Sequence, residues 1–189
     1  MGSNRSAFLR VLPLERGFNF RDFGGYPTGQ GRMVRQGMLF RSGTMTFLTI
    51  ADETKIRALG IRAICDFRRQ DEREKQPTRW HDTSRTIYWA RDYDEITGLL
   101  VDQLSHPATS ASDVRRIMAL LYRDLLVDQA PAYAEMFRLL AEGGVPLLIN
   151  CSAGKDRTGI GAALVLSSLG VDQALINDDY TATNLHANW

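Results

Sequence analysis

The chain has 189 residues, of which 44% are hydrophobic and 24% charged, and its formal net charge is +1. These values are typical of one globular domain, residues 1–189, and the near-neutral charge argues against nucleic acid or a membrane surface as a partner. Two cysteines exclude a disulfide scaffold and fit a reduced compartment, and no apolar run approaches the roughly 20 residues that span a bilayer.

The first predicted segment, residues 1–16, is a leader or flexible N-terminus. Arg10, Pro13 and Glu15 interrupt its apolar stretch, so it does not have the pattern of a secretory signal peptide. Because neither a signal peptide nor a membrane-spanning segment is visible, we expect a cytoplasmic protein without a stable membrane anchor.

The next segments predict short strands and one well-capped helix. Two extended pieces flank a turn region at 24–31, which is rich in glycine. Thr49 is then placed to cap a helix, Asp52 is in the capping-box position, and Gly60 ends the helix. The β-branched and apolar residues 61–67 predict a buried strand.

The middle of the chain mixes charged and helical patterns. The highly charged stretch 68–82 is predicted to be solvated, and 86–93 is a second strand candidate. Residues 95–112 predict a loop or short helix. Apolar residues at helical spacing then predict one helix over about 113–127, and a proline start with a Gly-Gly stop predicts another over about 131–142.

The C-terminal part predicts a strand, a loop and two helices. Residues 145–150 form a short apolar strand, 151–157 a loop, 158–170 an apolar helix and 172–184 a last helix. Strands that alternate with helices predict an α/β fold with a central, mostly parallel sheet flanked by helices.

The loop "CSAGKDR", residues 151–157 and called the cysteine loop below, combines a thiol with positive charge. Backbone N–H groups at a helix N-terminus bind a tetrahedral oxyanion, and the same field favours a thiolate, so we expect a depressed pKa for Cys151. Arg157 can hold two phosphate oxygens, and Thr158 can donate its hydroxyl to the sulfur. This pattern indicates nucleophilic attack on a phosphoryl group, a cysteinyl-phosphate intermediate and its hydrolysis.

The remaining loop residues refine this hypothesis. The small residues Ser152, Ala153 and Gly154 let the backbone wrap around an anion. A nucleotide-binding Gly-Lys loop is excluded, because Asp156 follows Lys155 where Ser or Thr is required.

"CSAGKDRTG" resembles the signature loop of the cysteine-dependent protein tyrosine and dual-specificity phosphatases. The segments "NFRDFGGY", "LFRSG", "LGIRAICDFRR" and "LGVDQALINDDYTATN" resemble, in this order, the atypical bacterial-type phosphatases of phosphotyrosine and phosphoinositides. The resemblance spans about 19–184 and implies a phosphatase-type strand, phosphate loop and helix, with no metal or other cofactor. The chain departs from the pattern at Asn150, where the superfamily usually has His, so we expect a less acidic thiol and lower turnover.

Cleavage of the ester also needs a proton for the leaving oxygen. By resemblance the donor is an Asp after an upstream strand, which favours Asp92 with Asp94 as the alternative; both can also be ordinary solvated carboxylates. Lys155 resembles the lipid phosphatases, where an added cation meets a second phosphate. Asp156 resembles the myotubularin-type loop, and we favour a structural role for it as an acceptor of loop or helix amides.

Other residues that could belong to a functional site also have a purely structural interpretation. By resemblance to one lipid phosphatase, Cys65 can form a reversible disulfide with the nucleophile, although a small buried hydrophobe is the favoured interpretation. Arg68 and Arg69 either line the cleft or lie on a solvated surface. The three histidines lack metal-ligand spacing.

The sequence therefore predicts a metal-independent phosphatase that acts on a phosphorylated protein or a phosphoinositide. Cys151, Arg157 and Asp92 are the predicted catalytic residues, and the predicted substrate-binding residues are Ser152, Ala153, Gly154, Lys155, Asp156 and Thr158. The alternative is a phosphate-binding pseudophosphatase with little turnover. A sulfur-transfer or arsenate-reducing enzyme fits less well, because Thr and Gly follow the arginine.

Overall fold

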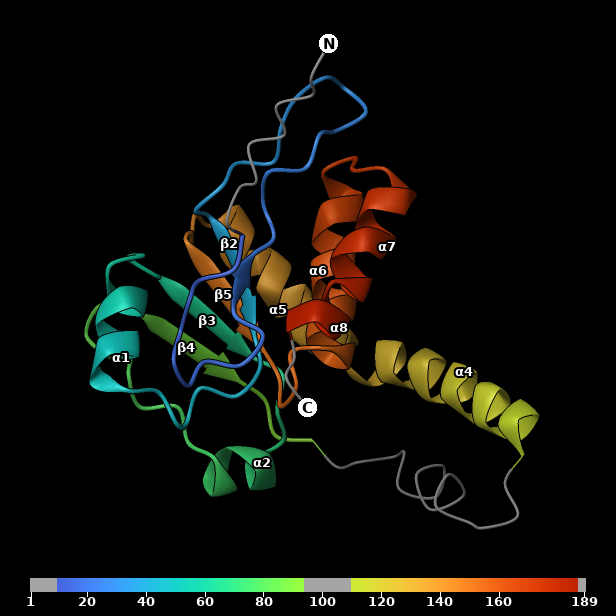
Figure 1. The fold of residues 1–189 in the computed structure, drawn as a ribbon, viewed down its shortest axis with the longest axis horizontal. Helices are drawn as coiled ribbons and strands as arrows, with labels where there is room; N and C mark the ends of the chain where they lie inside the picture. The colour runs from blue at the N-terminus through green and yellow to red at the C-terminus, as the bar shows by residue number, and fades with distance from the viewer. Residues whose placement is uncertain (1–9, 94–109, 187–189) are drawn as a thin grey trace.

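The computed structural model describes residues 10–93 and 110–186, which are built around one five-stranded sheet (Figure 1). The strand order is β1-β2-β5-β3-β4, in which β1 is antiparallel to β2 and the other neighbours are parallel. The predicted mostly parallel sheet is therefore confirmed. The strands are β1 (Arg21–Asp22), β2 (Leu39–Ser42), β3 (Ala63–Asp66), β4 (Ile87–Ala90) and β5 (Leu147–Asn150).

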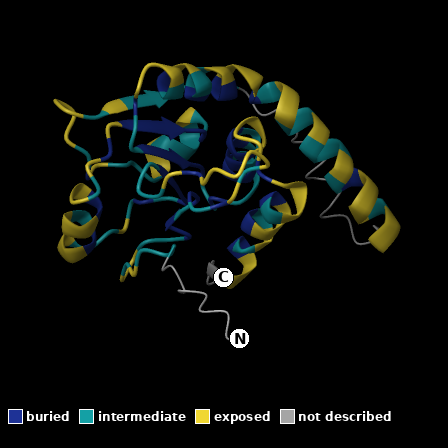
Figure 2. Ribbon diagram, turned by 90° about the horizontal axis from the view of Figure 1, so that it is seen from above, coloured by how far each residue is buried: buried dark blue, intermediate teal, exposed yellow. Residues whose placement is uncertain are grey.

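Helices cover both faces of the sheet. In Figure 1, α5, α6 and α7 lie on one side and α1 on the other, while α4 extends away from the sheet. Figure 2 shows the strands largely buried and the outer surfaces of the helices exposed. The helices are α1 (Ile50–Arg57), α2 (Gln70–Lys75), α4 (Ala111–Asp128), α5 (Ala130–Ala141), α6 (Asp156–Ser168), α7 (Gln173–Thr181) and α8 (Thr183–His186). Within the described residues, no helix is long and apolar enough to cross a membrane.

The helices differ from the prediction in an added helix, a shifted start and a division. The stretch 68–82 contains α2, and α6 begins at Asp156 rather than at 158. The predicted last helix is divided into α7 and α8 beside Thr181, whose hydroxyl donates to the backbone carbonyl of Asn177 (2.9 Å). Such side-chain bonds to the preceding turn disturb regular helices. Most of the predicted loop 95–112 lies outside the described residues.

The predicted cap of α1 is confirmed and has an additional role. The Thr49 hydroxyl accepts from the N–H of Asp52, and the Asp52 carboxylate accepts from the N–H of Thr49, both at 3.2 Å. The same buried carboxylate accepts from the N–H groups of Glu15 (2.7 Å) and Arg16 (2.9 Å). Residues 10–16, part of the predicted leader, are therefore tied to the fold.

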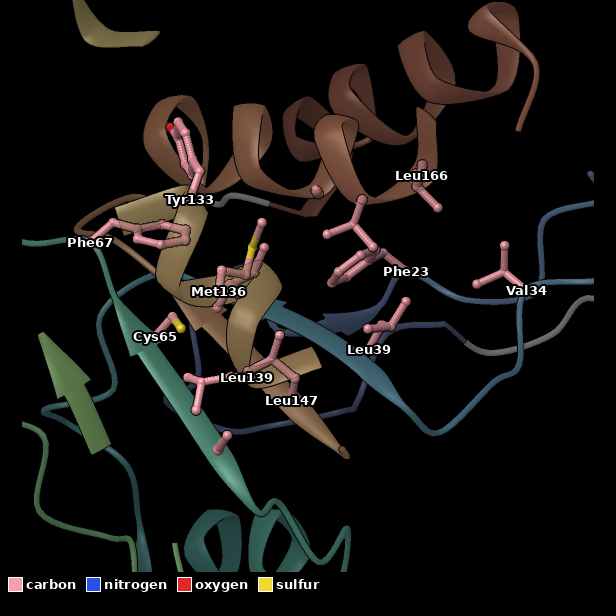
Figure 3. Close-up of a cluster of buried hydrophobic side chains, with 14 of the residues drawn as sticks. Phe23, Val34, Leu39, Cys65, Phe67, Tyr133, Met136, Leu139, Leu147 and Leu166 are labelled. Atoms are coloured by element: carbon pink, nitrogen blue, oxygen red, sulfur yellow. The ribbon is translucent and has the colours of Figure 1, made fainter. Parts of the chain in front are cut away.

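The core has two sides because side chains alternate along each central strand. In β5, Leu147 and Ile149 belong to the cluster that packs against α5 and α6, whereas Leu148 belongs to the cluster on the α1 side. Figure 3 shows the first cluster, in which Cys65 of β3 lies among apolar side chains of α5 such as Met136. β3 and β5 are thus buried on both faces, whereas β4 is partly exposed.

The sheet also brings one set of strand ends together. Because β2, β5, β3 and β4 are parallel, their carboxyl ends meet at one edge of the sheet. Ligand sites of open α/β sheets occur at this edge. The segments that begin after Ser42, Asp66, Ala90 and Asn150 surround it.

Candidate active site

Cys151 directly follows β5, and the cysteine loop leads from it into the N-terminus of α6. Its side chain is buried within the core cluster of β5 and α6. Gly154 has a left-handed backbone, with φ of +66°, and a Cβ atom there would lie 2.5 Å from the backbone of Ser42. Only glycine fits this turn without moving β2. The predicted strand, loop and helix are therefore present.

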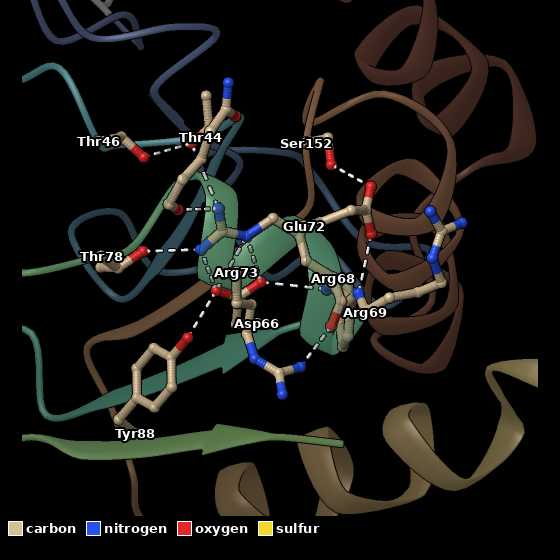
Figure 4. Close-up of polar contacts among 12 residues, drawn as sticks. Thr44, Thr46, Asp66, Arg68, Arg69, Glu72, Arg73, Thr78, Tyr88 and Ser152 are labelled. Carbon is tan, nitrogen blue, oxygen red and sulfur yellow. Dashed lines mark hydrogen bonds and ion pairs between the residues drawn. The ribbon is translucent and has the colours of Figure 1, made fainter. Parts of the chain in front are cut away.

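Arg157, in the first turn of α6, binds a carboxylate that comes from α2. Its two terminal nitrogens Nη1 and Nη2 lie 2.6 Å and 2.7 Å from the oxygens Oε2 and Oε1 of Glu72. Ser152 of the cysteine loop donates its hydroxyl to the same carboxylate, and Figure 4 shows Ser152 and Glu72 facing each other. The loop and the arginine together thus hold a two-oxygen anionic group.

The negative charge of Glu72 and the positive charge of Arg157 stabilise each other. Burial by itself raises the pKa of Glu72, but hydrogen bonds from Arg157 and Ser152 lower it to about 2. Burial by itself lowers the pKa of Arg157. Its hydrogen bonds to Glu72 and the electrostatic influence of the nearby Cys151 raise that pKa above its ordinary value. Glu72 therefore remains a carboxylate at any physiological pH.

Two tyrosines and one carbonyl fix Arg157 further. Its Nη1 donates to the backbone carbonyl of Phe67 (3.0 Å) and to the hydroxyl of Tyr93 (2.9 Å). The hydroxyl of Tyr133 donates to the backbone carbonyl of Arg157 (2.9 Å). Glu72 and Tyr93 were not predicted from the sequence, because nothing local distinguishes them from other surface Glu and Tyr residues.

Arg68 and Asp66 show that the prediction of a solvated stretch at 68–82 is wrong at its start. Both side chains are fully buried, and Nη2 of Arg68 lies 2.6 Å from Oδ2 of Asp66. Tyr88 donates to the same carboxylate (2.7 Å), and Thr78 accepts from Arg68 (2.9 Å), as Figure 4 shows. A buried charge is tolerated when it is paired and hydrogen-bonded in this way. The pair anchors the segment that carries Glu72.

Two predicted side-chain contacts in or beside the cysteine loop are not formed. The Thr158 hydroxyl is buried and has no hydrogen-bond partner among the described residues, so the predicted bond to the sulfur of Cys151 is not formed. Asp156 accepts from the hydroxyls of Tyr122 and Tyr180 rather than from loop or helix amides. Its carboxylate thereby links the start of α6 to α4 and α7.

A cavity of about 390 Å³ opens beside Arg157. Its walls come from α2, the segment after β4, α4 and the start of α6. The lining residues are Arg69, Glu72, Tyr93, Met118, Leu121, Tyr122, Leu125, Asp128, Asp156 and Arg157. Its lining therefore combines two guanidinium groups and three carboxylates with an apolar wall from α4.

Asp92 lies at the correct edge of the sheet but outside this cavity. Its side chain is 64% exposed, and its carboxylate forms an ion pair with Arg73 of α2. The described lining residues of the cavity do not include it. The alternative acid, Asp94, lies outside the described residues.

Asn150 and Cys65 occupy neighbouring strands. Asn150 is fully buried, and neither its amide oxygen nor its amide nitrogen is hydrogen-bonded to a described residue. Cys65 and Cys151 are free thiols, and burial raises the pKa of Cys65 to about 12. Cys65 thus has the environment of a small buried hydrophobe.

The parallel sheet, with a thiol after its central strand and an arginine in the following helix, is the architecture of the cysteine-dependent phosphatases. The chain belongs to the tyrosine phosphatase family, which it matches over residues 12–189.

Two relatives and one solved structure illustrate the similarity. A Cupriavidus necator protein that carries the name of a tyrosine-protein phosphatase is 35% identical over 90% of this chain and 60% of its own. The triple specificity protein phosphatase PtpB of Mycobacterium tuberculosis is 30% identical, over 93% of this chain and 70% of its own. The crystal structure of P. aeruginosa TpbA in complex with phosphotyrosine matches 79% of this chain and 70% of its own, at 15% identity and a TM-score of 0.41. The chain spans less than two thirds of the length of the C. necator relative.

Proposed function

We propose that this chain is a metal-independent phosphatase that hydrolyses phosphotyrosine through a cysteinyl-phosphate intermediate. The observation that carries the proposal is the carboxylate of Glu72, whose two oxygens are bound by both terminal nitrogens of Arg157 and by the hydroxyl of Ser152. These oxygens stand in for two oxygens of a phosphoryl group.

The reaction has two displacements. The thiolate of Cys151 attacks phosphorus, the bond to the ester oxygen breaks, and its electron pair leaves with that oxygen, which takes a proton from an acid. Water then attacks the cysteinyl phosphate and gives a proton to the deprotonated acid, the sulfur–phosphorus bond breaks, and phosphate and the thiolate are released. Arg157 and the loop N–H groups stabilise the negative charge in both steps.

Asp92 remains the proposed acid. It directly precedes Tyr93, whose hydroxyl contacts Arg157, and its own ion pair with Arg73 is at the surface. Exposed ion pairs contribute little free energy, so this one is readily broken when substrate arrives. The carboxylate then has to reach the ester oxygen at the mouth of the cavity.

The cavity beside Arg157 supports an aryl ester as substrate. Its apolar wall contains Met118, Leu121 and Leu125 from α4, and the rings of Tyr93 and Tyr122 are adjacent. Apolar and aromatic side chains beside the guanidinium of Arg157 suit a ring that carries a phosphate. The names of the relatives agree with this substrate class. Phosphoinositide hydrolysis is the alternative, for which the cationic Arg69 in the same lining is the supporting feature.

The test is hydrolysis of p-nitrophenyl phosphate against pH with EDTA present. We expect activity in the wild type, none in Cys151→Ser, and full activity in the control Cys65→Ser. Loss of wild-type activity in EDTA would refute the cysteine mechanism. A folded wild type that binds vanadate without turnover would establish the pseudophosphatase instead. Phosphotyrosine peptides and phosphoinositide vesicles, compared by kcat/KM, then decide the substrate class.

A further inference from the structure

A buried polar cluster lies beneath the cysteine loop and joins three segments far apart in the sequence. Asn19 and Arg21 come from "NFRD", Arg41 from "LFRS" and Asp179 from "NDDY". All four side chains are at most 3% exposed. The proposed reaction uses none of them, although each sits within one hydrogen bond of the loop or of a residue that contacts it.

The cluster holds the loop by its carbonyl groups. The side-chain amide nitrogen of Asn19 donates to the carbonyl oxygens of Ala153 and Gly154, both at 3.0 Å. Nη2 of Arg41 donates to the same Gly154 oxygen (2.8 Å). The backbone N–H of Thr44 donates to the carbonyl of Ser152 (2.9 Å). Three successive carbonyls are therefore bound from the side of the N-terminal segments.

This arrangement determines where the loop N–H groups point. In a planar trans peptide the carbonyl and the following N–H lie on opposite sides. Carbonyls drawn outward at residues 152–154 therefore turn the N–H groups of residues 153–155 towards the concave side. Successive N–H groups that converge in this way bind anions.

The donors are themselves fixed by the rest of the cluster. Arg21 donates to the side-chain oxygen of Asn19, which leaves the amide nitrogen facing the loop. Asn19 has a left-handed backbone with φ of 55°, a conformation that Asn tolerates better than most residues. Asp179 of α7 accepts from Nη1 of Arg41 at 2.5 Å and lies 3.9 Å from Nε of Arg21.

The cluster also carries charge. Two guanidinium groups, of Arg21 and Arg41, share the single carboxylate of Asp179, and the hydroxyl of Tyr26 donates to that carboxylate (3.3 Å). One positive charge therefore remains in excess within a buried region that contacts Gly154. Such a charge, poorly screened by water, favours an anion on the other side of the loop.

We propose that Asn19 and Arg41, held by Arg21 and Asp179, are positioning residues that keep the N–H groups of the cysteine loop aimed at the substrate phosphate. The inference rests on the proposed function of the loop. It gives the segments around β1 and β2 and helix α7 a common role beside the loop.

The test measures anion affinity without turnover. Asn19→Gly removes the amide but keeps a backbone that is free to adopt positive φ. Asn19→Asp keeps the shape but places an oxygen against two carbonyl oxygens. Tyr26→Phe is the matched control, because it removes a hydrogen bond of the same buried cluster without touching the loop. Each protein is titrated with tungstate by calorimetry, and its unfolding free energy and its kcat and KM for p-nitrophenyl phosphate are measured in parallel.

We expect both Asn19 variants to weaken tungstate binding at least about tenfold, since displaced N–H donors lose much of their interaction. Tyr26→Phe, with a similar loss of stability, should stay within about twofold of the wild type. Folded Asn19 variants that bind tungstate as tightly as the wild type would overturn this inference and leave the proposed function standing. A wild type that neither binds tungstate nor hydrolyses the ester would overturn the proposed function and, with it, this inference.

Discussion

Replacement of Glu72 by Gln tests the ion pair that joins α2 to the cysteine loop. The pKa of Glu72 falls from 4.5 to about 2 on folding, although burial alone raises it, because Arg157 and Ser152 donate to the carboxylate. A shift of this size corresponds to about 3 kcal/mol. The side chains of Glu72 and Arg157 are 20% and 16% exposed, so solvent screens the pair only slightly. Gln resembles the protonated glutamic acid in shape and therefore removes the charge alone.

The sign of the pH dependence follows from the lowered pKa. The carboxylate contributes its full stabilisation above the unfolded pKa of 4.5, and this is lost as pH falls through the folded value of about 2. The unfolding free energies of wild type and Glu72→Gln should thus differ by about 3 kcal/mol at pH 7 and by about half as much at pH 3.

The assay is urea unfolding followed by circular dichroism, at pH values from 7 down to the lowest at which both proteins fold. Glu53→Gln is the control, because Glu53 forms an exposed ion pair with Arg57 within α1. Such pairs contribute about 0.5 kcal/mol or less. A difference for Glu72→Gln that is below about 1 kcal/mol, or that does not shrink with acid, would refute the assigned role of the pair.

Three further outcomes are expected. Gly154→Ala should cost more than about 2 kcal/mol of stability in urea unfolding and abolish ester hydrolysis, because its Cβ would lie 2.5 Å from Ser42 in a left-handed turn. Iodoacetamide at pH 8 should label Cys151 and spare Cys65, whose pKa of about 12 leaves roughly one thiolate in 10,000; equal labelling in peptide mass maps would contradict this. Asp92→Asn should lower kcat about a hundredfold for phosphotyrosine and less for p-nitrophenyl phosphate, whose leaving group needs little protonation. Equal losses on both substrates would exclude Asp92 as the acid.

The features that were predicted from the sequence depend on local chemistry. Thr49, Asp52 and Gly60 define α1 through hydrogen bonds and backbone angles within a few residues of each other. The apolar strand before Cys151 and the helix after it are likewise visible as short patterns in the sequence. Such patterns are sufficient to place a strand, a loop and a helix in the correct order.

The features that were missed depend on partners far away in the sequence. Arg68 looks like the start of a solvated charged run, and only the fold shows that Asp66, Tyr88 and Thr78 enclose it. Glu72 and Arg157 are 85 residues apart. Hydrophobic periodicity assigns charged residues to the surface, so it cannot identify the few that are buried in pairs.

The contacts around the cysteine loop bear on the interpretation of Asn150, the residue directly before Cys151. Asn150 stands where the related phosphatases usually have His, and its buried amide is bonded to none of the described residues. The loop is held instead by Asn19 and Arg41 at its carbonyls and by Glu72 at Ser152. Among the described residues, the side chains that support the loop by hydrogen bonds are therefore others than that of Asn150.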